Sequence, residues 1–259
     1  MATLTARIAL QYRLRQAQLS ARLVRQISST WRDLVDPARV DASWPALRAA
    51  LAAMVMVSRA ESTATASSFY LEARRTAGVA DDGFRPRAPD PLDWAQLATT
   101  LDITGPITFK KAIAAGKTPA QAVDAAAVRL AGSTQYTALQ GGRQLIQQAI
   151  EEDSGATGYA RVTDEDPCAW CAMLASRGPV YKTAVTAGDP RRGGDRYHPL
   201  CACQAVPAFT MDEPFIGVAE QLYDDWLRET RGYGGKNAVN AFRRWWESEG
   251  RSRYTAPTI

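Results

Sequence analysis

The chain has 259 residues and a formal net charge of +4, and its hydrophobic (46%) and charged (22%) fractions are ordinary. This length can bury a sizeable core without cross-links, and the composition excludes a chain that is disordered throughout. The most apolar stretch, 49–57, is too short to cross a bilayer, and charges interrupt the first 26 residues. We therefore expect no membrane segment and no export signal, and folding in a cytoplasm.

Two long helices are predicted in the first 76 residues. Apolar residues recur about every four positions from 3 to 30, with arginines between them, which indicates an amphipathic helix. Turn-forming residues at 36–45 then break the pattern. Ser43 is a good N-cap and Pro45 suits a first helical turn, so we expect the second helix to run from about Trp44 to Thr76.

Shorter helices follow a loop predicted at 78–94. We expect them near 94–100 and 107–115. Thr118 and Pro119 have the N-cap and first-turn pattern of another helix, which extends towards Glu152 and is interrupted around Gly141 and Gly142. No strand is predicted before 155.

The pattern changes after Gly155. Alternation predicts strands at 157–163 and 203–209, and helical patterns return at 214–230 and 237–249, on either side of a turn at 231–236. The tail after Gly250 is expected to be loose. We predict a mainly α protein with an α-helical region at 1–154, a small α+β zinc-binding module at 155–210 and a pair of C-terminal helices at 211–259.

All four cysteines and the only histidine fall within 168–203, with the spacing C-x2-C, 26 residues, then H-x2-C-x-C. A short pair places two ligands on one ion, and a distant second pair completes a tetrahedron. The candidate metal ligands are Cys168, Cys171, His198, Cys201 and Cys203. A structural zinc takes four ligands; we prefer three cysteines with His198, and the sequence leaves open which donor is spare.

Other uses of these thiols fit less well. Disulfides need an oxidising compartment, and a redox C-x2-C needs an adjacent βαβ pattern. A nucleophile pair of Cys171 or Cys201 with His198 would leave the other thiols unexplained. A catalytic zinc would need an open position and a nearby acid, for which Glu165, Asp166 and Asp195 are candidates. We favour a closed structural zinc, which replaces a core that about 50 residues cannot build.

The segments "YARVTDEDPCAWCAMLASRGPVYKT" and "DRYHPLCACQAVPAF" resemble minor head proteins of tailed bacteriophages, especially those of actinobacterial hosts, which are similar to the phage Mu F-like (MuF-like) minor capsid proteins. The resemblance covers about 160–208, and the matching positions are Cys168, Cys171, His198, Pro199, Cys201 and Cys203. It implies a virion protein attached to the portal protein inside the procapsid, in contact with major capsid or scaffold protein. It also implies a role in head assembly and in the fate of packaged DNA.

Two other functions stay open. Proteins of related phages are also described as capsid maturation proteases, but His198 is already assigned to the metal motif, and no lysine sits in a convincing nucleophile turn. We therefore expect no enzyme activity. A zinc-containing DNA-binding protein is the other alternative, although no recognition-helix signature follows the first cysteine pair.

Arginine and tryptophan are unevenly distributed. Nine arginines and no lysine fall within 1–60, so the first helix either faces packaged DNA or has a solvated basic face. Trp226, Trp245 and Trp246 form either a docking surface for a portal or capsid subunit or part of the protein's own core. Trp170 is expected to cover the metal site.

Overall fold

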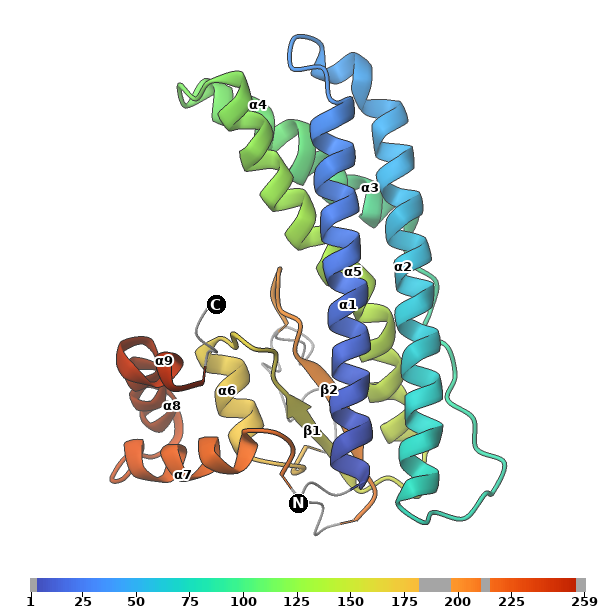
Figure 1. The fold of residues 1–259 in the computed structure, drawn as a ribbon, viewed down its shortest axis with the longest axis vertical. Coiled ribbons are helices and arrows are strands. Elements are labelled where there is room, and N and C mark those ends of the chain that lie inside the picture. Colours follow the sequence, from blue (N-terminus) through green and yellow to red (C-terminus); the bar gives the residue numbers. More distant parts are fainter. Residues whose placement is uncertain (1–3, 182–196, 211–214, 255–259) are drawn as a thin grey trace.

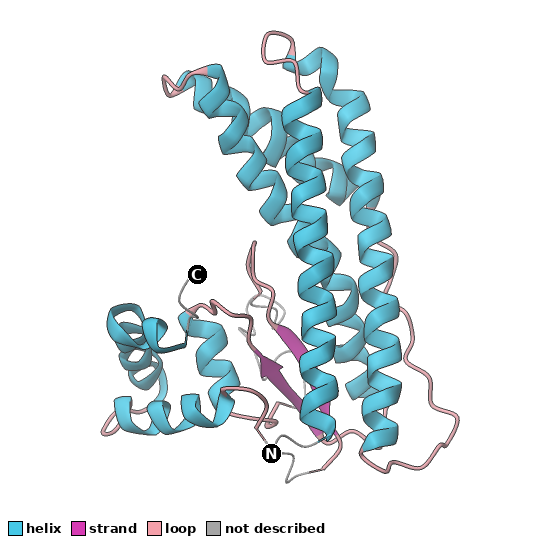
Figure 2. Cartoon of the chain, viewed as in Figure 1, coloured by secondary structure: helices cyan, strands magenta, loops and turns pink. Residues whose placement is uncertain are grey.

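A computed structural model describes residues 4–181, 197–210 and 215–254, and it is mainly helical, as predicted (Figures 1 and 2). Three long helices form a bundle: α1 (Leu4–Leu34), α2 (Val40–Thr76) and α5 (Pro119–Glu152). A shorter run packs against α2 and α5 and consists of α3 (Trp94–Asp102), the π-helical turn η1 (Ile103–Ile107) and α4 (Thr108–Ala114).

A two-stranded antiparallel sheet lies between the bundle and the C-terminal helices (Figure 1). Its strands are β1 (Gly158–Val162) and β2 (Gln204–Ala208), which confirms both predicted strands. The register places Arg161 opposite Ala205. Between the strands, α6 (Ala169–Ser176) packs on β1; after β2 come α7 (Ala219–Glu229), α8 (Gly235–Trp245), η3 (Trp246–Gly250) and α9 (Arg251–Tyr254).

Two apolar cores run through the molecule. One lies at the α3–α4 end of the bundle and includes Trp31, Leu51 and Leu130. The other joins the opposite end of the bundle to the sheet and the C-terminal helices, and Ile146 and Phe242 both belong to it. The second core therefore fixes the sheet against the bundle, while the predicted division at 154 and 210 stays a prediction.

The predicted start of α2 was wrong by one helical turn. Val40 and Trp44 are both buried and lie four residues apart, so burying this face extends the helix upstream of Ser43. The Ser43 hydroxyl accepts a hydrogen bond from the backbone N–H of Asp36 at 3.3 Å and does not cap the helix, and Pro45 lies inside it.

The predicted interruption of α5 was also wrong, because its glycines serve close packing. A Cβ at Gly141 would lie 2.7 Å from the Arg59 backbone oxygen, and a Cβ at Gly142 would lie 2.8 Å from Ser62 Oγ. Ser62 Oγ donates to Gln16 Oε1 at 2.8 Å, and Gln16 Nε2 donates to the Ser62 carbonyl at 3.0 Å. Gly141 and Gly142 thus allow α5 to approach a buried polar contact between α1 and α2.

At the C-terminal end, the expectation of a loose tail was wrong for 251–254. Tyr254 stacks on Trp246 with ring centroids 5.6 Å apart, and its hydroxyl donates to Asp225 at 2.6 Å. Trp245 and Trp246 are buried against Phe242. These two tryptophans therefore belong to the protein's own core and not to a docking surface.

Among the described helices, α2 is the one whose length and composition would allow it to span a bilayer. Here it packs against α1 and α5, and core helices of soluble proteins share this composition.

Replacing Gly141 with alanine is expected to destabilise the fold by about 1–3 kcal/mol, because the added methyl group overpacks the contact with α2. At an unhindered helix position the same change would stabilise by about 1 kcal/mol. Urea unfolding measures the difference. Val128→Ala, at an exposed position of α5, is the control and should stay within about 0.5 kcal/mol. A more stable Gly141→Ala variant would contradict the close approach.

Candidate metal centre

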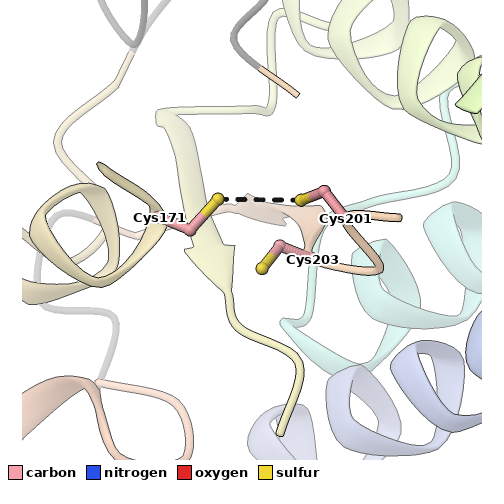
Figure 3. Close-up of side chains that lie close together, drawn as sticks. All are labelled: Cys171, Cys201 and Cys203. Atoms are coloured by element: carbon pink, nitrogen blue, oxygen red, sulfur yellow. Dashed lines mark hydrogen bonds between the residues drawn. The ribbon is translucent and has the colours of Figure 1, made fainter. Parts of the chain in front are cut away.

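Three cysteine sulfurs meet beside the sheet, where Cys171 of α6 faces Cys201 and Cys203 (Figure 3). The three Sγ atoms lie within 4.8 Å of one another, and those of Cys171 and Cys201 are 3.7 Å apart. All three residues are buried. A tetrahedral zinc with bonds of about 2.3 Å separates its sulfurs by about 3.8 Å. The two cysteine pairs therefore converge, and these three thiols could hold a metal ion.

Local backbone structure presents the thiols. Cys168 is the N-cap of α6, where its Sγ accepts a hydrogen bond from the Cys171 amide at 3.5 Å, and the first helical turn carries Cys171 inwards. On the other side, the Cys201 amide donates to the His198 carbonyl at 3.0 Å and closes a turn. Leu200 has a φ of +67° in this turn, and Pro199 precedes it, which is the type II pattern.

Cys168 and His198 lie next to the three clustered thiols. Cys168 is partly buried and packs against them, whereas His198 is exposed. Hydrogen bonds from Cys171 and from His198 outweigh burial and lower the pKa of the Cys168 thiol to about 4. The hydrogen bond with Cys168 raises the pKa of His198 to about 9. All five predicted donors thus come to one region, with Cys171, Cys201 and Cys203 at its centre.

Two buried arginines flank the centre. Arg143 of α5 is 1% exposed and Arg161 of β1 is 2% exposed. Both guanidinium groups lie over the ring of Tyr197. The distance to the ring centroid is 3.6 Å for Arg143 and 4.0 Å for Arg161. Both rank among the largest fully buried side chains of the described chain. Cation–π contact with one ring only partly compensates the desolvation of two such cations.

Both arginines also contact the cysteine segments directly. Arg143 donates to the backbone carbonyls of Cys201 at 2.6 Å and Cys203 at 3.0 Å. Arg161 donates to Cys171 Sγ at 3.5 Å. Although burial disfavours the Arg161 cation, neighbouring Tyr197 and the three thiols outweigh it and raise its pKa. The hydrogen bond from Cys171, with the two arginines, lowers the pKa of Cys201.

The two described acids proposed from the sequence lie next to arginines. Glu165 is exposed and lies 3.7 Å from Arg13, Asp166 pairs with Arg251, and Asp195 lies outside the described residues. Asp164 was not predicted; its Oδ2 accepts from the Ala202 amide at 2.8 Å, and its own amide donates to Cys203 Sγ at 3.3 Å. Burial raises the pKa of this carboxyl.

Sequence reasoning missed the residues that surround the thiols. Trp170 packs against the larger apolar core, while Tyr197 and Tyr136 pack against the thiols instead. Nothing in the sequence indicated that Arg143 and Arg161 lie at the site, because an arginine on a helix or a strand normally indicates a solvent-facing position. Only the position of Tyr197, directly before His198, could have suggested a role in the site.

The chain belongs to the VG15 protein family, whose sequence model matches residues 3–228. A curated relative, the Gene 15 protein of Mycobacterium phage D29, is 27% identical over 141 residues, which cover 43% of this chain and 51% of the relative. The chain therefore spans about half the length of that relative. No solved structure matches the chain. These matches support the predicted connection with bacteriophages, and membership of the MuF-like proteins stays a prediction.

Leu200 provides a test of the turn before Cys201. Because β-branched residues are strongly disfavoured at positive φ, Leu200→Ile is expected to destabilise the fold by about 1 kcal/mol although it keeps the same atoms. Leu200→Asn should stay within about 0.5 kcal/mol, since asparagine tolerates this conformation. Urea unfolding compares the two variants. Equal stability of the isoleucine variant and the wild type would contradict the turn geometry.

Proposed function

We propose that this VG15 family member is a structural protein of a phage head, held together by a zinc ion at its cysteine centre. In this proposal it is a minor capsid protein that binds near the portal inside the procapsid and supports head assembly and DNA packaging or ejection. The phage family supports the virion role. The observation that carries the zinc proposal is the convergence of three buried thiols from segments 30 residues apart in sequence.

The geometry favours a structural role for the metal over a catalytic one. Cys171 and Cys203 are 0% exposed, and Cys201 is 2% exposed. A catalytic zinc keeps a position open to substrate, whereas a structural zinc is closed by four protein ligands. Zinc bound here would supply Lewis-acid bonds that replace thiol protons and join α6 to the segment before β2. Cys171, Cys201 and Cys203 would provide three ligands, and Cys168 or His198 the fourth.

Some arginines of α1 make ion pairs with other helices of the bundle, and others are exposed on its surface. Ion pairs join Arg22 to Glu61 at 2.6 Å and Arg32 to Asp124 at 2.9 Å, so part of the basic segment holds the bundle together. Exposed arginines of α1 without an ion pair to a described residue are Arg7, Arg15 and Arg25. In our proposal these three offer contacts to packaged DNA or to an acidic surface of the scaffold.

The purified chain is expected to contain one equivalent of zinc by elemental analysis. Cys171→Ser should lose the ion and lower the melting temperature by roughly 5–10 °C, equivalent to about 2–3 kcal/mol. Ala172→Ser places a hydroxyl at the neighbouring buried position and is the matched control, which should retain zinc. Chelator titration of the wild type provides the same comparison without a substitution. Wild-type protein without zinc, or an unchanged melting curve after zinc removal, would refute the proposed structural zinc.

The virion role predicts a specific partner. Full-length chain should co-sediment with assembled portal protein, and co-expression with the major capsid protein should give no specific cleavage. Specific cleavage of the capsid protein that disappears in His198→Ala would instead support a protease. Failure to co-sediment with the portal would contradict the proposed location.

A further inference from the structure

Two buried cations beside the thiols require a compensating charge. Removing a guanidinium from water costs several kcal/mol unless an anion or a full set of acceptors replaces the solvent. Within the described residues, neither Arg143 nor Arg161 makes an ion pair with a carboxylate. Nε and one terminal nitrogen of Arg143, and Nε of Arg161, also have no hydrogen-bond partner there. Among the described residues, the thiols are the source of negative charge in contact with Arg161, and Arg143 donates to the backbone carbonyls of two of the same cysteines.

The nearest acid does not supply this charge. Asp164 is partly exposed, its carboxylate accepts from the amides of Ala202 and Asp166, and its own backbone amide donates to Cys203 Sγ. Neither arginine donates to it. Among the described residues, the metal centre itself is therefore the anion placed to balance the buried pair of cations.

The charge of a zinc centre depends on its ligands. Zinc with three thiolates and a neutral imidazole has one net negative charge, whereas zinc with four thiolates has two. We infer that the fourth ligand is Cys168, so that a four-thiolate zinc centre is charge-balanced by Arg143 and Arg161. This inference rests on the zinc site proposed above and replaces our preference, based on sequence, for three cysteines with His198.

The positions of the two candidate ligands agree with this assignment. Cys168 is partly buried and packs against the three clustered thiols. It lies at the N-terminus of α6, where the helix dipole and the Cys171 amide favour a thiolate. His198, by contrast, is exposed. Its side-chain contact is with Cys168. His198 would thus orient the Cys168 thiolate from the solvent side, as an outer partner of the site.

Zinc K-edge X-ray absorption of the full chain tests the ligand set. We expect four sulfurs at about 2.3 Å and no nitrogen at about 2.0–2.1 Å. His198→Ala should keep this spectrum and one equivalent of zinc. Cys168→Ser should lose one sulfur from the shell. Three sulfurs and one nitrogen in the wild type would overturn the inference while leaving the zinc proposal intact, and a chain that binds no zinc would overturn the zinc proposal itself.

A second test addresses the arginines through zinc affinity, measured by competition with a chromophoric chelator. Arg161→Gln should weaken binding by roughly 10–100-fold, the usual effect of losing an outer partner, whereas Arg161→Lys keeps the charge and should retain most of the affinity. Arg59→Gln is the control, because Arg59 is partly buried but its guanidinium donates to Thr137 and Gln144 in the bundle. Equal affinities of the Arg161→Gln and Arg59→Gln variants would contradict the role of Arg161.

Discussion

The two buried guanidinium groups of Arg143 and Arg161 meet at the ring of Tyr197 and donate to the cysteine segments, and these contacts link the parts of the fold. Arg143 comes from the long bundle helix α5, Arg161 comes from strand β1, and Tyr197 lies between them. Separating the sheet from the bundle would break the hydrogen bonds of Arg143 with the Cys201 and Cys203 carbonyls and its contact with the Tyr197 ring. The segments around the thiols are therefore fixed to the bundle by the contacts of Arg143 as well as by the shared apolar core.

The bundle contributes shape to this arrangement as well as charge. At Gly132 of α5, a Cβ would lie 3.0 Å from the Cβ of Pro199, so the turn before Cys201 rests directly on the helix. Arg143, three turns further along α5, then holds the carbonyls of Cys201 and Cys203. Gly132 and Arg143 of α5 thus set the position of the segment that carries the second cysteine pair, independently of any metal.

The sequence predicted those features of the structure that depend on residues close together in the chain. Alternation over a few residues located both strands, and the spacing of the cysteines predicted that Cys171 would meet Cys201. The sequence did not predict features that depend on contacts between residues far apart in the chain. Gly141 suggests a helix break until the neighbouring helix is known, and Arg143 suggests a surface residue although its acceptors lie 58 and 60 residues away in sequence. The sequence left the fourth ligand open for the same reason, since our assignment of Cys168 depends on charges from other elements.

The C-terminal helices are attached to the same centre from the opposite side. Trp246 Nε1 donates to the Pro167 carbonyl at 3.2 Å, and Arg251 pairs with Asp166, so both contacts fall directly before Cys168. Helix α6, which carries Cys171, also packs against α7 and α8. A ligand at Cys168 would therefore restrain the backbone on which these helices dock. Metal bound at Cys168 would be mechanically coupled to the position of the C-terminal helices, because Pro167 alone separates Asp166, the partner of Arg251, from the proposed fourth ligand.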